Sequence, residues 1–477
     1  MTLWEDAIEA ATADYVEQLE QRGFLADGQH LSGDLQVDSS VVPIRIEIPD
    51  SFPFVPPIVW PPDDFPRSWH REQSGAMCLY PGDNRENLPW LDADNFLATT
   101  GQWLRQSIDG WVGDFPDLDL ERYFGQASER LVTYGDLDAL SSRFIQLRYE
   151  KNLTRVVGAG SIPRGSRGLK KNRAFGYVAN IGEPATPPTS WDELTSMLPE
   201  ADVRAIEVAI GDGRLSYLII RYSRRGVGAA VALRAWQAKS GAIELAAVQS
   251  ACDAASVLEL RAGACSAQLA DVGVVVVGAG AIGSFLCDLL ARAGVGTVTV
   301  YDPDIVRPGN LIRHLVGPDF VGLPKPEAVR QTIESRPFNS SVVIAHSDTA
   351  PVPRQVMSLF AESSLVIDAS AAGGITDMLG KAAIAGGHHL LSVCLQEEGL
   401  VARVDIIPPL HGEPLPPTEI GPPTGRQELK FEAGCGEPVS QTPAFAVLEA
   451  ASLAARCAVG MLTGAPICSA GIIHDYR

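Results

Sequence analysis

The clearest chemistry in this chain lies in its last 220 residues. Four consecutive valines lead into a glycine turn and the start of an apolar helix, Gly278-Ala279-Gly280-Ala281-Ile282-Gly283. In such a turn Gly278 lets the chain reverse, Gly280 lets backbone N–H groups approach a phosphate, and Gly283 lets helix and strand pack closely. Asp302 ends the next apolar run, where a carboxylate can bind a ribose hydroxyl. Taken alone, this pattern predicts a dinucleotide-binding dehydrogenase.

Polar and cationic residues that follow Asp302 favour a different ligand. Asn310, Arg313 and Lys325 stand eight, eleven and twenty-three residues after Asp302. A nicotinamide site has no need of this cationic pair, whereas a nucleotide triphosphate does, because its charge must be held while a carboxylate attacks the α-phosphate. We therefore expect a nucleotide triphosphate rather than NAD as the ligand.

The same motifs resemble the ThiF-like adenylation domain of ubiquitin-activating enzymes and sulfur-carrier adenylyltransferases. That family's pattern runs GxGxxGS, D-x-D, N-x-x-R and lysine, and here it is met by Gly278–Ser284, Asp302-Pro303-Asp304, Asn310–Arg313 and Lys325. The resemblance implies ATP with Mg²⁺ as the cofactor, with no residue assigned as a protein ligand to the metal. It also implies that Arg313 and Lys325 act on the phosphates, and that Gly278, Gly280, Gly283, Asp302, Asn310 and Asp368 bind the nucleotide. The chain departs from the pattern twice, with His314 where glutamine is usual and Ala371 where a second aspartate is usual.

A proline- and glycine-rich stretch, residues 408–426, predicts a long loop that ends near Cys435 and a following helix. The resemblance implies that Cys435 forms a thioester with the activated carboxylate. The position just ahead of a helix also favours a thiolate. The alternative is an ordinary loop cysteine.

The first part of the chain predicts an α+β domain. Apolar spacing predicts a helix over residues 3–22, alternation predicts a strand over 42–48, and a further amphipathic helix is expected over 94–107. Between them stand F-P-F-x-P-P, a histidine, G-x-x-C-L and a tryptophan, an order that resembles ubiquitin-conjugating domains. The resemblance implies that Cys78 accepts the modifier as a thioester.

The match around Cys78 is incomplete, because that family's H-P-N tripeptide is reduced to His70 followed by Arg71 and Glu72. Asn84 or Asn87 are candidates to replace the missing asparagine. The alternative interpretation makes Cys78 a buried core thiol in a non-catalytic domain.

Residues 131–255 are less informative. The Gly-, Arg- and Lys-rich stretch 158–173 predicts a solvated loop, with binding of an acidic partner as the alternative. Two apolar runs, 206–210 and 215–220, flank a Gly-Asp-Gly turn and predict a β-hairpin. We expect a scaffold domain that joins the two ends.

Composition limits the class of protein. The chain has 477 residues and a formal net charge of −20, which disfavours nucleic acid and anionic membranes as partners. The longest apolar stretch, 272–287, contains four glycines and predicts a strand and turn rather than a membrane span. No C-x-x-C pair occurs, so we expect no zinc site, and the N-terminus has no signal-peptide pattern. We expect a cytoplasmic protein.

These observations predict an α/β chain with three domains: 1–130, ubiquitin-conjugating-like; 131–255, middle; and 256–477, doubly wound adenylation. The resemblance implies ATP-dependent activation of a protein modifier's C-terminal carboxylate, a thioester relay from Cys435 to Cys78, and transfer to a target lysine. A fusion this short resembles the combined activating and conjugating protein of bacterial antiphage (CBASS) operons and related bacterial ubiquitin-like operons. The modifier is then a ubiquitin-like protein or a nucleotide cyclase.

Two alternatives remain open: a sulfur-carrier adenylyltransferase whose N-terminal domain only docks, and a catalytically dead scaffold. The resemblance also implies a homodimer formed through the C-terminal domain, to which Arg261 is a candidate contributor.

Overall fold

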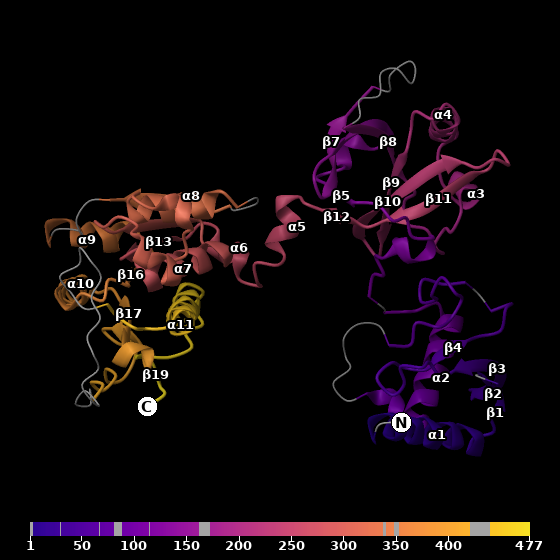
Figure 1. The fold of residues 1–477 in the computed structure, drawn as a ribbon, viewed down its shortest axis with the longest axis horizontal. Helices are drawn as coiled ribbons and strands as arrows, with labels where there is room; N and C mark the ends of the chain where they lie inside the picture. Colours follow the sequence, from indigo (N-terminus) through magenta and orange to yellow (C-terminus); the bar gives the residue numbers. More distant parts are fainter. Residues whose placement is uncertain are drawn as a thin grey trace. The chain divides into compact units, whose positions relative to one another are not determined.

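The computed structural model describes residues 3–28, 30–65, 67–80, 88–113, 115–161, 172–336, 340–347, 353–419 and 439–477. The chain divides into two compact units, Met1–Asp253 and Ala254–Arg477. The first unit contains a four-stranded and an eight-stranded sheet, and the second contains one seven-stranded sheet (Figure 1).

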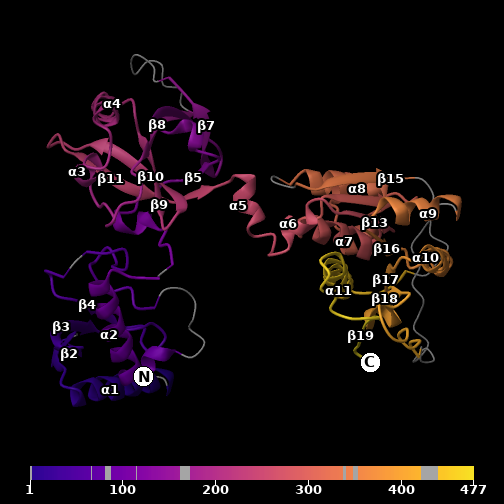
Figure 2. The same cartoon turned by 180° about the vertical axis from the view of Figure 1, so that it is seen from behind.

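The N-terminal part of the first unit is an antiparallel meander with two long helices. Its elements are α1 (Leu3–Gln21), β1 (Leu25–Asp27), β2 (His30–Val37), β3 (Ser40–Glu47), β4 (Ile58–Trp60), η1 (Pro89–Leu91) and α2 (Ala93–Asp109). Inward residues alternate along β3, and α2 begins where the Asp92 side chain accepts the Asn95 N–H at 2.8 Å. Figure 2 shows this part from behind, with α2 packed on the meander. The predicted helices and strand are confirmed.

The rest of the first unit is built on the eight-stranded sheet, of order β11-β10-β9-β8-β6-β7-β5-β12. Its elements are η2 (Leu120–Tyr123), β5 (Leu131–Tyr134), η3 (Asp138–Leu140), β6 (Arg143–Tyr149), β7 (Leu153–Ala159), β8 (Arg173–Asn180), α3 (Trp191–Thr195), α4 (Glu200–Gly211), β9 (Tyr217–Arg224), β10 (Val227–Gln237), β11 (Ile243–Val248) and β12 (Ser250–Cys252). Helices α3 and α4 form the crossover between the parallel strands β8 and β9.

The predicted hairpin is wrong in its first strand, because residues 206–210 lie in α4. Ile206, Ala209 and Ile210 are buried at helical spacing, so packing on the sheet selects the helix over a short apolar strand. The hairpin joins β9 to β10 instead. Its two-residue loop, Arg225-Gly226, has positive φ at both positions, as a tight hairpin turn requires.

The second unit is a doubly wound α/β domain, as predicted. Its elements are α5 (Ala255–Glu259), α6 (Ser266–Leu269), β13 (Gly273–Val277), α7 (Ala281–Arg292), β14 (Thr297–Tyr301), η5 (Pro308–Arg313), η6 (Pro318–Phe320), α8 (Lys325–Glu334), β15 (Val342–His346), α9 (Pro353–Glu362), β16 (Leu365–Asp368), α10 (Gly373–Gly386), β17 (Leu390–Gln396), η7 (Glu397–Gly399), β18 (Val401–Ile407), α11 (Ala444–Leu462) and β19 (Gly471–Asp475).

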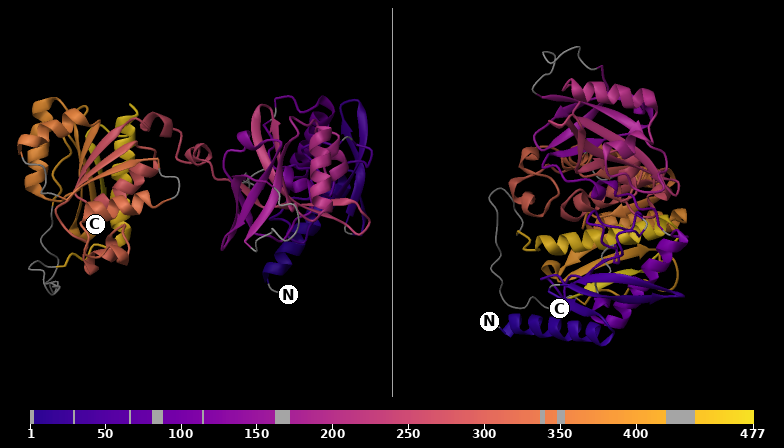
Figure 3. Two further views of the ribbon diagram at one scale, coloured as in Figure 1. Left: turned by 90° about the horizontal axis from the view of Figure 1, so that it is seen from above. Right: turned by 90° about the vertical axis from the view of Figure 1, so that its right-hand side faces the viewer.

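The strand order of this sheet fixes where a ligand can bind. The order is β15-β14-β13-β16-β17-β18-β19, with the first five strands parallel and the last two antiparallel. Side chains of α7, α8 and α11 share one core with the sheet, while those of α9 and α10 share another. Figure 3 shows helices on both faces of this sheet. The chain leaves β13 toward β14 and returns on the other side at β16. Ligands of such sheets bind at this switch point, beyond the carboxyl ends of the strands.

Among the described helices, α11 has the length and hydropathy that could cross a membrane. Its Ala450, Ala454, Cys457 and Ala458 are fully buried. They contribute to the core shared with α7 and the sheet, as expected for the central helix of a folded domain. The apolar stretch 272–287 forms β13, the glycine turn and the first half of α7, as predicted.

Candidate functional site

The glycine turn joins β13 to α7 at the switch point. Gly278 has φ +101°, donates its N–H to the Tyr301 carbonyl at 2.7 Å, and would place a Cβ 2.7 Å from the backbone of Ala369. A Cβ on Gly283 would lie 1.9 Å from the Gly278 carbonyl oxygen. Both positions therefore require glycine for close backbone packing.

Gly280 has different surroundings. No atom lies within 4 Å of the position that its Cβ would occupy, and its φ of −75° is open to other residues. It is the N-cap of α7, and no side chain caps the first turn of that helix. Uncapped N–H groups at a helix start, next to open space and at the positive end of the helix dipole, fit an anionic phosphate.

Asp302 and His314 together fix the residue between the first two glycines. Asp302 accepts the Ala279 N–H through Oδ2 at 2.7 Å, and His314 Nε2 donates to the Ala279 carbonyl at 2.7 Å. His314 Nδ1 accepts the Val316 N–H at 3.3 Å, which defines the neutral tautomer. Burial lowers the pKa of His314 and keeps the ring neutral. The sequence identified His314 only as a departure from the family pattern, and this structural role was missed.

Lys325 lies beside the carboxylates of Asp304 and Asp302. It is the first residue of α8, and its Nζ lies 2.7 Å from Asp304 Oδ2 and 3.9 Å from Asp302 Oδ1. Its side chain is 12% exposed. The ammonium group therefore has a fixed position beside the predicted ribose-binding aspartate.

Asn310 and Arg313 lie on η5 and contact different partners. The Asn310 side-chain oxygen accepts the Arg307 N–H at 2.9 Å, so it shapes the start of η5. Arg313 Nη1 donates to Ser440 Oγ at 3.1 Å and to the Thr442 carbonyl at 3.3 Å. Arg313 thus contacts the segment that leads into α11, after the stretch with Cys435. Cys435 itself lies outside the described residues.

Asp368 ends β16 opposite Val277 and is fully buried. Its Oδ1 accepts the Ser370 N–H at 3.0 Å and the Ser370 hydroxyl at 2.6 Å, and its Oδ2 accepts the Thr376 hydroxyl. Both oxygens therefore accept hydrogen bonds, Oδ1 from Ser370 in the turn after β16 and Oδ2 from Thr376 in α10. The described residues contain no group of three His, Cys, Asp or Glu side chains that could hold a metal ion.

Cys78 lies in the first unit, after a small turn closed by Glu72 and Ala76. Its N–H donates to the His70 carbonyl at 2.9 Å, and Arg71 pairs with Met77 in an isolated bridge. The side chain is half-buried. Burial raises the pKa of the Cys78 thiol, Arg122 lowers it and Glu72 raises it. Asn84 and Asn87, the candidates to replace the missing asparagine, lie outside the described residues.

The fold defines the second unit as a doubly wound domain with a glycine turn and an uncapped helix start at its switch point. Residues 257–409 match the ThiF family. The chain therefore contains a ThiF-family domain.

Curated relatives match different extents of the chain. An uncharacterized protein of Sinorhizobium fredii, y4qC, is 27% identical over 407 residues, which cover 75% of this chain and 69% of the relative. The sulfur carrier protein ThiS adenylyltransferase of Bacillus subtilis is 30% identical over 139 residues, 29% of this chain and 41% of the relative. The ubiquitin-like modifier-activating enzyme 5 of Drosophila mojavensis is 38% identical over 77 residues, 16% of this chain and 19% of the relative. The last two matches span less than half of the relatives' lengths.

Among solved structures, Escherichia coli MccB with ATP is 18% identical with a TM-score of 0.34, over 45% of this chain and 61% of that chain.

Proposed function

We propose that the protein uses ATP to activate a C-terminal carboxylate of a protein modifier as an acyl-adenylate, releasing pyrophosphate. The observation that carries this proposal is the meeting of Lys325 and Asp302 beside the open, uncapped start of α7 at Gly280. A fixed cation next to a helix start suits a polyphosphate, because both stabilise negative charge that develops during attack on the α-phosphate. The ThiF-family match and the Bacillus relative's name support the same reaction class.

In this proposal Gly280 and the first turn of α7 bind phosphate oxygens, and Asp302 binds the ribose. Arg313 and Lys325 stabilise the phosphate charge, with Asn310 and Asp368 placed around them. Mg²⁺ would enter with the nucleotide, and no protein ligand to it is assigned.

The proposal continues with two acyl transfers. The Cys435 thiolate attacks the adenylate carbonyl, forming a thioester and releasing AMP, and the Cys78 thiolate then exchanges with that thioester. A lysine amine of the target takes the acyl group from Cys78, so that the C–S bond is replaced by a C–N bond. The support for the second cysteine is its local setting: a helix, a four-stranded meander, the turn before Cys78 and then α2 occur in the order of a ubiquitin-conjugating domain.

A sulfur-carrier adenylyltransferase is the second candidate, and the Bacillus relative's name favours it. In that case Cys78 would carry no modifier. We further propose a cytoplasmic setting in bacterial antiphage defence, with a ubiquitin-like protein or nucleotide cyclase as the modifier and a homodimer as the working form.

The test uses purified full-length protein, ATP, Mg²⁺ and proteins encoded beside its gene as candidate modifiers. Mass spectrometry should find thiol-sensitive adducts at Cys435 and Cys78. Cys435→Ala should make adenylate but carry no thioester, and Cys78→Ala should trap modifier on Cys435. If the Cys435→Ala variant still carries modifier on Cys78, the order of the relay is wrong. An adduct at one cysteine or none, with nucleotide turnover, would favour sulfur-carrier chemistry, and no turnover would favour a scaffold.

A further inference from the structure

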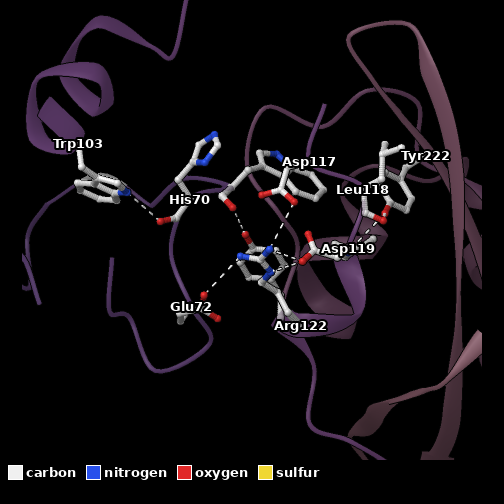
Figure 4. A network of polar contacts seen from close by, with 11 residues as sticks. His70, Glu72, Trp103, Asp117, Leu118, Asp119, Arg122 and Tyr222 are labelled. Carbon is white, nitrogen blue, oxygen red and sulfur yellow. Dashed lines mark hydrogen bonds and ion pairs between the residues drawn. The ribbon is translucent and has the colours of Figure 1, made fainter. Parts of the chain in front are cut away.

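The side chain of Arg122 reaches the turn that precedes Cys78, although Arg122 and Cys78 are forty-four positions apart in the sequence. Arg122 belongs to η2, between α2 and the eight-stranded sheet. Its Nη1 lies 3.6 Å from Glu72 Oε1, and Glu72 is the first residue of the turn before Cys78. Figure 4 shows the guanidinium group reaching Glu72 on one side and the carboxylates of Asp117 and Asp119 on the other.

Asp117 and Asp119, which lie just before η2, hold the guanidinium group of Arg122 in place. Arg122 Nε donates to Asp119 Oδ2 at 2.6 Å, Nη2 contacts the same oxygen, and Nη2 lies 3.6 Å from Asp117 Oδ1. Nη1 is buried and makes no hydrogen bond in the described part of the chain, because the Glu72 carboxylate with which it forms an ion pair lies 3.6 Å away. This N–H can therefore still donate to a group on which negative charge develops.

The eight-stranded sheet fixes the position of η2. The Leu120 N–H donates to the Tyr222 hydroxyl of β9 at 3.1 Å, and the Tyr123 hydroxyl donates to the Trp69 carbonyl. Trp69 itself stacks on Tyr222 with ring centroids 5.8 Å apart. The segment before Cys78 and the segment that carries Arg122 are therefore both held by β9. Residues 131–255 thus contribute directly to the surroundings of Cys78.

We propose that Arg122 is the cationic group of the Cys78 site, which stabilises the Cys78 thiolate and the oxyanion that forms during acyl transfer. In this proposal Arg122 supplies the charge stabilisation that the incomplete H-P-N pattern lacks. The acyl-transfer part of this inference rests on the function proposed above. In the final transfer the amine forms the new C–N bond, the electron pair of the broken C–S bond leaves on sulfur, and the amine proton passes to water. Negative charge appears first on the carbonyl oxygen and then on sulfur, both within reach of a cation beside Cys78.

The direct test measures the reactivity of Cys78 without any modifier. Purified full-length protein is alkylated with iodoacetamide, which is uncharged, and the rate at Cys78 is followed by peptide mass spectrometry from pH 8 upward. The series starts above neutral pH because burial and the adjacent Asp119 raise the pKa of the Asp117 carboxyl, which pairs with Arg122. Arg122→Gln should raise the pKa of Cys78 and slow alkylation about tenfold for each unit of pKa. Arg122→Lys should restore part of the rate.

Glu72→Gln gives an expected change of opposite sign. It removes a carboxylate that disfavours the thiolate, so alkylation of Cys78 should become faster. Glu72 is half-exposed, so Glu72→Gln should fold. It therefore tests the proposal even if Arg122→Gln does not fold. Arg105→Gln, which removes a surface arginine paired with Asp38 at 3.3 Å, is the control and should leave the rate unchanged. Wild-type rates in both Arg122→Gln and Glu72→Gln would overturn the proposal.

A second measurement separates this inference from the proposed function. With ATP and modifier, Arg122→Gln should load Cys435 normally and Cys78 slowly. If wild-type protein forms no thioester at all, the relay is wrong and the acyl-transfer role of Arg122 is wrong with it. The alkylation series would still decide whether Arg122 stabilises the Cys78 thiolate.

Discussion

Asp302 and His314 hold the two polar groups of the same residue, Ala279, from opposite sides. The aspartate accepts its N–H and the histidine donates to its carbonyl, each at 2.7 Å. The glycine turn is therefore fixed by side chains before any nucleotide arrives. Such preorganisation saves the cost of ordering the turn when the ligand binds.

His314 should make the stability of this turn depend on pH. Burial lowers the pKa of His314 below the unfolded value of 6.5, so its contribution is complete above that value and is lost as the pH falls below it. In His314→Gln the amide can still donate to Ala279, and nothing titrates. Between pH 7 and 5 the melting temperature of wild type should therefore fall more steeply than that of His314→Gln. His30→Gln, at a half-exposed position in the other unit, should follow wild type. Parallel curves for wild type and His314→Gln would contradict this role.

The substitutions Gly280→Ala and Gly283→Ala should have different effects, the first on ATP binding and the second on stability. At Gly283 the new methyl would lie 1.9 Å from a carbonyl oxygen. Ordinary overpacking costs about 1–3 kcal/mol of stability, and this closer approach should cost more, so we expect lost stability or no folded protein. At Gly280 the methyl meets nothing within 4 Å, so the melting temperature should stay near wild type. The methyl would nevertheless occupy the space assigned to phosphate, and ATP binding should be lost. Thermal melting and calorimetry separate the two effects, and full ATP affinity in Gly280→Ala would place the phosphates elsewhere.

Arg313→Ala should slow adenylate formation by about 10²–10³-fold while leaving the domain folded, as expected for loss of one charge-stabilising donor. Pyrophosphate exchange in the presence of modifier is the measurement. Lys381→Ala, which removes a surface lysine paired with Asp377 at 2.6 Å, is the matched control. A variant that retains full exchange would leave Arg313 only its contacts with Ser440 and Thr442.

A homodimer is expected in solution through the C-terminal unit. Arg261, the predicted contributor, is exposed just after α5. Light scattering over a range of protein concentrations should report twice the 50.9 kDa of one chain. A single-chain mass at every concentration would remove the dimer and the proposed part of Arg261 in it.

The second unit could be predicted from the sequence because its main features are local. The glycine turn follows a strand and starts a helix, and Asp302 follows the next strand, so short patterns place them at one sheet edge. His314 was missed because its role depends on a carbonyl thirty-five residues away. The contacts of Arg313 with Ser440 and Thr442 are equally non-local, and no pattern indicates them.

The first unit contains more features that local sequence patterns do not predict. Residues 206–210 are apolar and β-branched enough to suggest a strand, yet burial of one face against the sheet makes them helical. Arg122 lies outside every motif that drew attention to Cys78, and only the folding of η2 against β9 brings it there. The domain described from the sequence as a scaffold therefore positions a charge at a candidate active site.

The central claim is that the second unit binds ATP rather than a nicotinamide dinucleotide. Isothermal titration calorimetry of the full chain with ATP and Mg²⁺, and separately with NAD, tests it most directly. We expect saturable binding of ATP with Mg²⁺ that Gly280→Ala abolishes, and no heat of binding with NAD. Binding of NAD, with none for ATP and Mg²⁺, would contradict the account.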